Sequence, residues 1–219
     1  MGRWSLLDRT AIILAGGPSK RFGREKGLVD LSGRPLVTYV QEAVRSLAEE
    51  LIVVFSSKNQ ADCFRRAVDR SARIIIDADV LRCPIVGAVS GLSHATGKYS
   101  ALLACDMPLI SANVVSRLYD MCIHRDATVP RWPNGFIEPL HAVYRTEVAL
   151  QASRSSLKEG RMDMRSMIER LSDVRYISTL FLQRLDSQLW TFFNINSQED
   201  LRQAEICLRR LNVKGVWSQ

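Results

Sequence analysis

The sequence lacks the cysteine patterns that indicate disulfide cross-links or a structural zinc ion. Its five cysteines are an odd number, and no two of them have the CxxC spacing. An odd count without paired spacing is not typical of a disulfide framework or of a zinc site. We therefore expect reduced thiols and a cytoplasmic protein.

Long apolar runs are also missing. No run approaches the roughly 20 apolar residues that a membrane helix needs. The first ten residues, MGRWSLLDRT, contain no apolar stretch of the kind found in a signal peptide. We therefore expect no membrane partner and no secretion signal.

No block of like charge occurs, although the formal net charge is +7. A basic balance favours anionic partners such as nucleotides or phosphorylated cofactors. An RNA-binding module is an alternative, but its interleaved aromatic residues and motifs are absent, so we expect no nucleic-acid partner. With 219 residues, of which 47% are hydrophobic, the chain is long enough for one sizeable core.

Short apolar runs alternate with helical patterns in the first part of the chain. The apolar runs predict strands over 10–15, 51–56, 72–77 and 99–105. The helical spacing predicts helices over 35–48, 59–69 and 86–94, and another that Ser111 caps. This alternation is typical of βαβ units. We predict an α/β fold with a Rossmann-like, mostly parallel sheet, flanked by helices on both faces, in a single domain over 1–219.

The second part of the chain is less regular. Strands are predicted over 127–132, 139–145 and 191–196, and helices over 146–157, over 163–171 and from Ser197 onward. On a strand over 191–196, Asn194 and Asn196 would share one face, because side chains alternate with period two. Capping of the following helix is the alternative role for these asparagines.

The stretch ILAGGPSKRFGREKG, residues 13–27, directly follows the first expected strand. Ligands of open α/β sheets bind beyond the carboxyl ends of the strands. Gly16 and Gly17 allow the backbone to approach a ligand closely, and Arg21 and Lys26 add positive charge. Neither GxxxxGK[ST] nor GxGxxG is present, so a simple turn with solvated lysines stays open as the alternative to a phosphate site.

Five segments, in order along the chain, resemble the motifs of MobA-type nucleotidyltransferases. They are LAGGPSKRFGREKG at 14–27, Asp77 with the CPIVGAVSGL that follows it, CDMPLI at 105–110, EPLHAVY at 138–144 and NINSQEDL at 194–201. The resemblance spans residues 11–201 and points to the molybdenum cofactor guanylyltransferases. It implies transfer of GMP from GTP to molybdopterin, and it allows contacts with other proteins of molybdenum cofactor biosynthesis.

The resemblance also implies roles for individual residues. Asp106 would hold Mg²⁺ together with substrate phosphates, and Lys26 and Arg21 would neutralise the triphosphate. The implied nucleotide-binding residues are Leu14, Ala15, Gly16, Gly17, Lys26, Asp77 and Asp106. The implied acceptor-binding residues are Asn194 and Asn196. The nucleotide-binding half would cover about 1–125, and the half that binds the pterin acceptor about 126–219.

Some positions depart from the family pattern. Cys83 stands where the family has glycine, and Ser56 and Ser57 stand near the place of an asparagine that contacts guanine in the family. The LAGG form of the first motif resembles guanylyltransferases, so we expect GTP as the donor. Two alternatives stay open, a cytidylyltransferase or other nucleotidyltransferase of the same fold and a non-catalytic nucleotide-binding regulatory protein.

Overall fold

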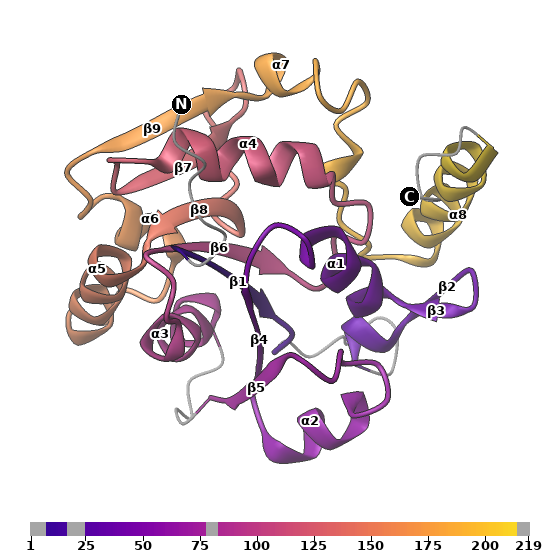
Figure 1. Cartoon of the computed structure of the whole chain (residues 1–219), viewed down its shortest axis with the longest axis horizontal. Helices are drawn as coiled ribbons and strands as arrows, with labels where there is room; N and C mark the ends of the chain where they lie inside the picture. Colours follow the sequence, from indigo (N-terminus) through magenta and orange to yellow (C-terminus); the bar gives the residue numbers. More distant parts are fainter. Residues whose placement is uncertain (1–7, 17–24, 78–82, 214–219) are drawn as a thin grey trace.

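The computed structural model describes residues 8–16, 25–77 and 83–213 (Figure 1). Gly17 and Arg21, two of the expected site residues, lie outside these ranges. Within them, no helix combines the length and the apolar character that are needed to cross a membrane.

A seven-stranded sheet forms the centre of the described part of the chain. Its strands are β1 (Arg9–Leu14), β4 (Glu50–Phe55), β5 (Arg73–Ile76), β6 (Tyr99–Ala104), β7 (Ala127–Arg131), β8 (His141–Arg145) and β9 (Val174–Ser178). They lie in the order β5-β4-β1-β6-β8-β7-β9. β8 is antiparallel to its neighbours β6 and β7, whereas the other neighbouring pairs are parallel.

Helices cover both faces of this sheet (Figure 1). One face carries α1 (Leu36–Val44), α2 (Lys58–Phe64), α4 (Ala112–Cys122) and α7 (Thr179–Leu182). The opposite face carries α3 (Pro84–His94), α5 (Thr146–Lys158) and α6 (Met164–Ile168). Ile13 of β1 packs into the first layer and Ile12 into the second, and both are fully buried. Burial on both faces explains the continuous apolar strands and confirms the predicted α/β class.

A smaller third cluster lies beside the main layers. After the short 3₁₀ helix η2 (Lys26–Leu28), strands β2 (Asp30–Leu31) and β3 (Arg34–Pro35) form a hairpin. Its turn contains Ser32 and Gly33, both with positive φ. Leu31 of this hairpin lies in one buried cluster with residues of α8 (Gln198–Val213), the helix next to the hairpin in Figure 1. This packing joins the last described helix to the segment that carries Lys26.

The predicted strand over 191–196 is wrong. Residues Trp190–Phe192 form the 3₁₀ helix η3, and 193–197 have no regular secondary structure. The apolar residues of this run serve two clusters, because Phe192 packs into the main core and Ile195 into the cluster with α8. Asn194 and Asn196 therefore do not share the face of a strand. β9 and α7 were not predicted, and the helices expected over 35–48 and 59–69 end earlier, at Val44 and Phe64.

Candidate functional site

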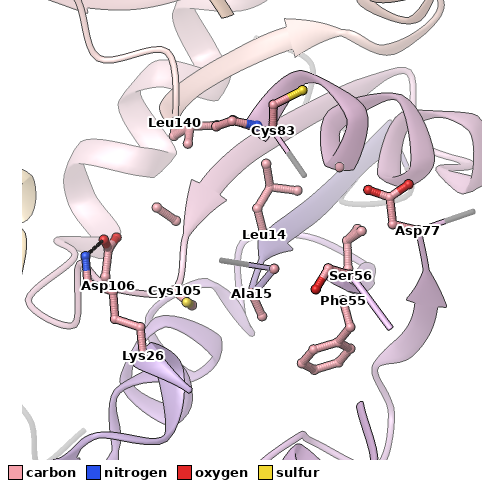
Figure 2. Close-up of a pocket in the computed structure, with 15 residues that line it drawn as sticks. Leu14, Ala15, Lys26, Phe55, Ser56, Asp77, Cys83, Cys105, Asp106 and Leu140 are labelled. Atoms are coloured by element: carbon pink, nitrogen blue, oxygen red, sulfur yellow. Dashed lines mark hydrogen bonds and ion pairs between the residues drawn. The ribbon is translucent and has the colours of Figure 1, made fainter. Parts of the chain in front are cut away.

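A cavity of about 230 Å³ opens at the sheet edge where β1, β4, β5 and β6 end (Figure 2). Its lining includes six of the residues expected to bind nucleotide, namely Leu14, Ala15, Gly16, Lys26, Asp77 and Asp106. They come from four separate parts of the sequence. The parallel direction of the strands brings these parts to one edge, as expected for the ligand site of an open α/β sheet.

The end of β1 forms the centre of the cavity wall. Leu14 accepts a hydrogen bond at its carbonyl from the Cys105 N–H at 3.2 Å, and the Ala15 N–H donates to the Val54 carbonyl at 2.9 Å. A Cβ atom on Gly16 would lie 3.1 Å from the backbone nitrogen of Ser56. Glycine at this position therefore allows the chain after β1 to lie directly against the chain after β4.

Lys26 and Asp106 form an ion pair in the wall of the cavity (Figure 2). The ammonium of Lys26 donates to Asp106 Oδ2 and also to Asn196 Oδ1, the latter at 2.6 Å. About one-fifth of each side chain is exposed, with values of 20% for Lys26 and 18% for Asp106. Both charges therefore remain accessible to an incoming ligand.

The second carboxylate oxygen of Asp106 has a different environment. Oδ1 is buried and has no hydrogen-bond partner among the described residues. A buried carboxylate oxygen without a partner is costly unless a cation or a donor satisfies it. The arrangement therefore leaves one anionic ligand position available next to the Lys26 ion pair.

Asn196 is held next to this site because the preceding residue, Ile195, bonds to the backbone of Asp106. The Ile195 N–H donates to the carbonyl of Asp106 at 2.9 Å, and the Ile195 side chain is fully buried against α8 and the hairpin. The segment that carries Asn194 and Asn196 is thereby fixed next to Asp106 without being part of a strand.

Asp77 lies on the other side of the cavity from Lys26 and Asp106 (Figure 2). It directly follows β5, and its backbone N–H donates to the Phe55 carbonyl at 2.7 Å. Its Oδ1 atom accepts a hydrogen bond from the Ser90 hydroxyl of α3 at 2.9 Å. Ser90, which sequence reasoning missed, thus orients the carboxylate of Asp77.

Two cysteines line the same cavity. Burial raises the pKa of the Cys105 thiol far above its usual range, so this thiol stays protonated. Cys83 precedes α3 with a φ of −139°, an extended conformation that any residue adopts. Cysteine therefore fits where the family pattern has glycine, without backbone strain.

The reversed direction of β8 brings its beginning to the site. Leu140 lines the cavity, and its carbonyl accepts from the Ala104 N–H at 3.2 Å. Glu138 accepts a hydrogen bond from Trp132 Nε1 at 2.7 Å, and burial raises the pKa of its carboxyl. His141 is fully buried within β8, which lowers its pKa to about 3. Glu138 thus lies before β8 and next to the cavity wall formed by Leu140, whereas His141 is part of the core.

Comparisons with known proteins agree with this geometry. Residues 11–174 match the model of the MobA-like NTP transferase domain. The chain is 34% identical over 200 residues to a probable molybdenum cofactor guanylyltransferase of Pyrococcus furiosus, covering 90% of this chain and 96% of that protein. It is 32% identical over 202 residues to the molybdenum cofactor guanylyltransferase of Desulfosudis oleivorans, covering 91% and 96%.

A solved structure gives a similar result. The crystal structure of molybdopterin-guanine dinucleotide biosynthesis protein A from Archaeoglobus fulgidus has a TM-score of 0.78 and 28% sequence identity to this chain. The match covers 92% of this chain and 99% of that protein. The similarity therefore extends over both halves of the sheet.

Proposed function

This chain belongs to the MobA-like NTP transferase family, and we propose that it transfers GMP from GTP to the terminal phosphate of molybdopterin. Pyrophosphate is the second product. The observation that carries the proposal is the junction of Lys26, Asp106 and Asn196 beside a cavity whose opposite side holds Asp77. One side suits phosphates, and the other suits the hydrogen-bond donors of a base.

The proposed reaction is a substitution at the α-phosphorus of GTP. An oxygen of the acceptor phosphate forms the new bond to phosphorus, and the bond to the pyrophosphate oxygen breaks. Both reactants are anions, so positioning and electrostatic stabilisation account for most of the catalysis. In this proposal Lys26 neutralises charge on the triphosphate and on the leaving pyrophosphate, while Asn196 orients the ammonium. The backbone at Ala15 and Gly16 borders the phosphates.

The donor atoms at Asp106 fit a magnesium ion. Oδ1 is a buried carboxylate oxygen without a partner among the described residues, and Asn196 Oδ1 is a second oxygen nearby, since both residues bond the same ammonium. Across the described ranges, no group of three or more His, Cys, Asp or Glu side chains could enclose a metal. Mg²⁺ typically takes one or two carboxylates and completes its shell with water and substrate phosphates. We therefore propose Asp106 as its protein ligand, where the ion would offset phosphate charge.

The acceptor is proposed to bind on the side of β8, β7 and β9. Asn194 and Asn196 are the proposed acceptor-binding residues, in a half that covers about 126–219, and about 1–125 would bind the nucleotide. Gly17 and Arg21 keep their proposed nucleotide roles from the sequence. We further propose a cytoplasmic location and contacts with other proteins of molybdenum cofactor biosynthesis, which would supply the pterin.

Guanine is the proposed base because of Asp77. The N1 and N2 edge of guanine presents two hydrogen-bond donors, and one carboxylate can accept both together. Cytosine and adenine lack this pair of donors, so either would leave the carboxylate poorly satisfied. Sites built for specific hydrogen bonds strongly reject ligands that cannot make them.

The test is kcat/KM for GTP, CTP and ATP at a fixed concentration of molybdopterin, with the dinucleotide product identified by mass. We expect GTP to exceed the other two by about a hundredfold or more. A preference for CTP would establish the cytidylyltransferase alternative. Nucleotide binding without any turnover would establish the regulatory alternative.

A further inference from the structure

Gln60 is a buried side chain next to the cavity that the proposed mechanism does not use. It lies in α2 and is only 5% exposed. We infer that Gln60 is a positioning residue of the nucleotide site, whose amide fixes three cavity segments relative to one another. This inference rests on the proposed function, because it concerns the same cavity.

The side-chain amide uses its whole hydrogen-bonding capacity. Nε2 donates to the Ala15 carbonyl at 3.1 Å and to Glu25 Oε2 at 2.5 Å. Oε1 accepts from the backbone N–H of Ser56 at 2.8 Å and from its hydroxyl at 2.9 Å. Two N–H donors and two lone pairs are all that a glutamine amide offers. One side chain therefore links the end of β1, the end of β4 and the segment before η2.

Two of these segments carry groups proposed to face the triphosphate, and the third lines the same cavity. Ala15 and Ser56 line the cavity, and Glu25 immediately precedes Lys26. Gly16 lies so close to Ser56 that a Cβ atom would come within 3.1 Å of its backbone nitrogen. A shift of Ala15 away from Ser56 would therefore move the backbone that borders the phosphates, and a shift of Glu25 would move Lys26 relative to Asp106.

Only an amide meets all of these demands. Ala15 and Glu25 offer acceptors, whereas Ser56 offers donors. A carboxylate at position 60 would face the Ala15 carbonyl and the Glu25 carboxylate with no proton to share, which is unfavourable for buried groups. The backbone N–H of Gln60 donates to the Ser57 hydroxyl at 3.2 Å. This cap of α2 involves no side-chain atom of Gln60, so it does not depend on the substitution.

The chain offers a matched control in Gln41 of α1, which is 4% exposed. Its Nε2 donates to the carbonyls of Val37 at 3.2 Å and Ala67 at 2.9 Å, and its Oε1 accepts from the Asp69 N–H at 2.7 Å. None of these partners lines the cavity. Gln41→Glu therefore also replaces a buried amide, which donates to backbone carbonyls, by a carboxylate, but it does so away from the cavity.

The experiment measures the dissociation constant of GTP by calorimetry, at a temperature where thermal melting shows each protein to be folded. We expect Gln60→Glu to weaken GTP binding by about tenfold or more. Gln41→Glu should lose comparable thermal stability and keep its GTP affinity within about twofold. Gln60→Met, which removes the amide without adding charge, should weaken binding in the same direction and serves if Gln60→Glu does not fold.

A donor exchange gives the sharper readout. In the double variant Glu25→Gln/Gln60→Glu, the new amide at position 25 can donate to the new carboxylate, which still accepts from Ser56. We expect this variant to bind GTP several-fold more tightly than Gln60→Glu alone. Equal GTP affinity of Gln60→Glu, Gln60→Met and wild type would overturn the inference. So would a loss of GTP affinity in Gln41→Glu equal to that in Gln60→Glu, or a double variant that binds GTP no more tightly than Gln60→Glu. Failure of wild type to bind GTP would instead overturn the proposed function, so the two failures are distinguishable.

Discussion

The two halves of the sheet supply the site in different ways. In the half formed by β5, β4, β1 and β6, parallel strands all end at one edge, and the residue after each strand points to the same cavity. In the half formed by β8, β7 and β9, the reversed β8 brings its beginning to that edge. A residue's place at the edge, rather than its order in the chain, therefore decides whether it can contribute to the site.

The halves also differ in how far their ionisable side chains are exposed to solvent. The half with β5, β4, β1 and β6 keeps the Lys26–Asp106 pair partly open to solvent. The half with β8, β7 and β9 buries His141 completely, where the ring contacts the Thr191 hydroxyl at 3.0 Å and packs in a T-shaped arrangement with Phe192. Substitutions in the first half should therefore act on catalysis, and those at His141 on stability.

Replacement of Asp106 by asparagine should have the largest effect. It removes the formal charge beside Lys26 and the proposed magnesium ligand but keeps the shape of the side chain. The loss of one such electrostatic element typically costs about a hundredfold or more in kcat. The backbone bond from Ile195 to Asp106 does not depend on the side chain, so the melting temperature should change little. Wild-type kcat at saturating Mg²⁺ would contradict the assignment.

Lys26→Ala should have the next largest effect, on GTP binding and on rate together. A hydrogen bond to a charged group is worth about 1.5–3 kcal/mol, which corresponds to about ten- to a hundredfold. Steady-state KM and kcat for GTP test this prediction. Lys158→Ala, at an exposed position near the end of α5, is the matched control and should change neither value. If KM and kcat for GTP were unchanged in Lys26→Ala, Lys26 would be an ordinary solvated lysine without a role in the reaction.

The smallest effect on catalysis is expected at His141, which acts instead on stability as a function of pH. Burial lowers its pKa in the folded protein to about 3, whereas an unfolded chain has a value near 6.5. Between these values the unfolded chain binds one more proton, so the free energy of unfolding decreases as the pH falls. The slope from this group approaches about 1.4 kcal/mol per pH unit. Urea unfolding of wild type and His141→Gln between pH 7 and 4 gives the free energy of unfolding of each protein at each pH. The difference between the two proteins measures the contribution of His141. If both free energies changed with pH in the same way, this prediction would be contradicted.

The parallel half was predictable because its inner strands, β4, β1 and β6, are largely buried on both faces. Continuous apolar runs such as 99–105 and amphipathic helices alternate there, so periodicity alone identified most elements. β9 gave no such signal, because Arg175 interrupts its apolar residues and its Tyr176 is 44% exposed. The run 191–196 gave a misleading one, since its aromatic and apolar residues fill two separate clusters rather than one sheet face.

The site was predictable to the extent that its residues follow strands or resemble family motifs. Asp77 and Asp106 come directly after apolar runs, and the glycine loop follows β1. The contact between Lys26 and Asn196 could not be derived from local pattern, because it depends on how α8 packs against the hairpin. Gln60 was missed for a similar reason, since an amide on a helix gives no periodic signal of the four bonds that it makes.

The pairing of Lys26 with Asp106 and Asn196 has a consequence for biosynthesis. These partners lie 80 and 170 residues beyond the lysine in the chain. The ribosome synthesises the chain from the N-terminus onward, so β1 and the glycine-rich sequence after it leave the ribosome long before Asn196 does. A nascent chain halted before residue 196 would lack one of the two oxygen atoms that hold the ammonium. Completion of the proposed phosphate site is thus timed by the end of translation rather than by formation of the parallel sheet.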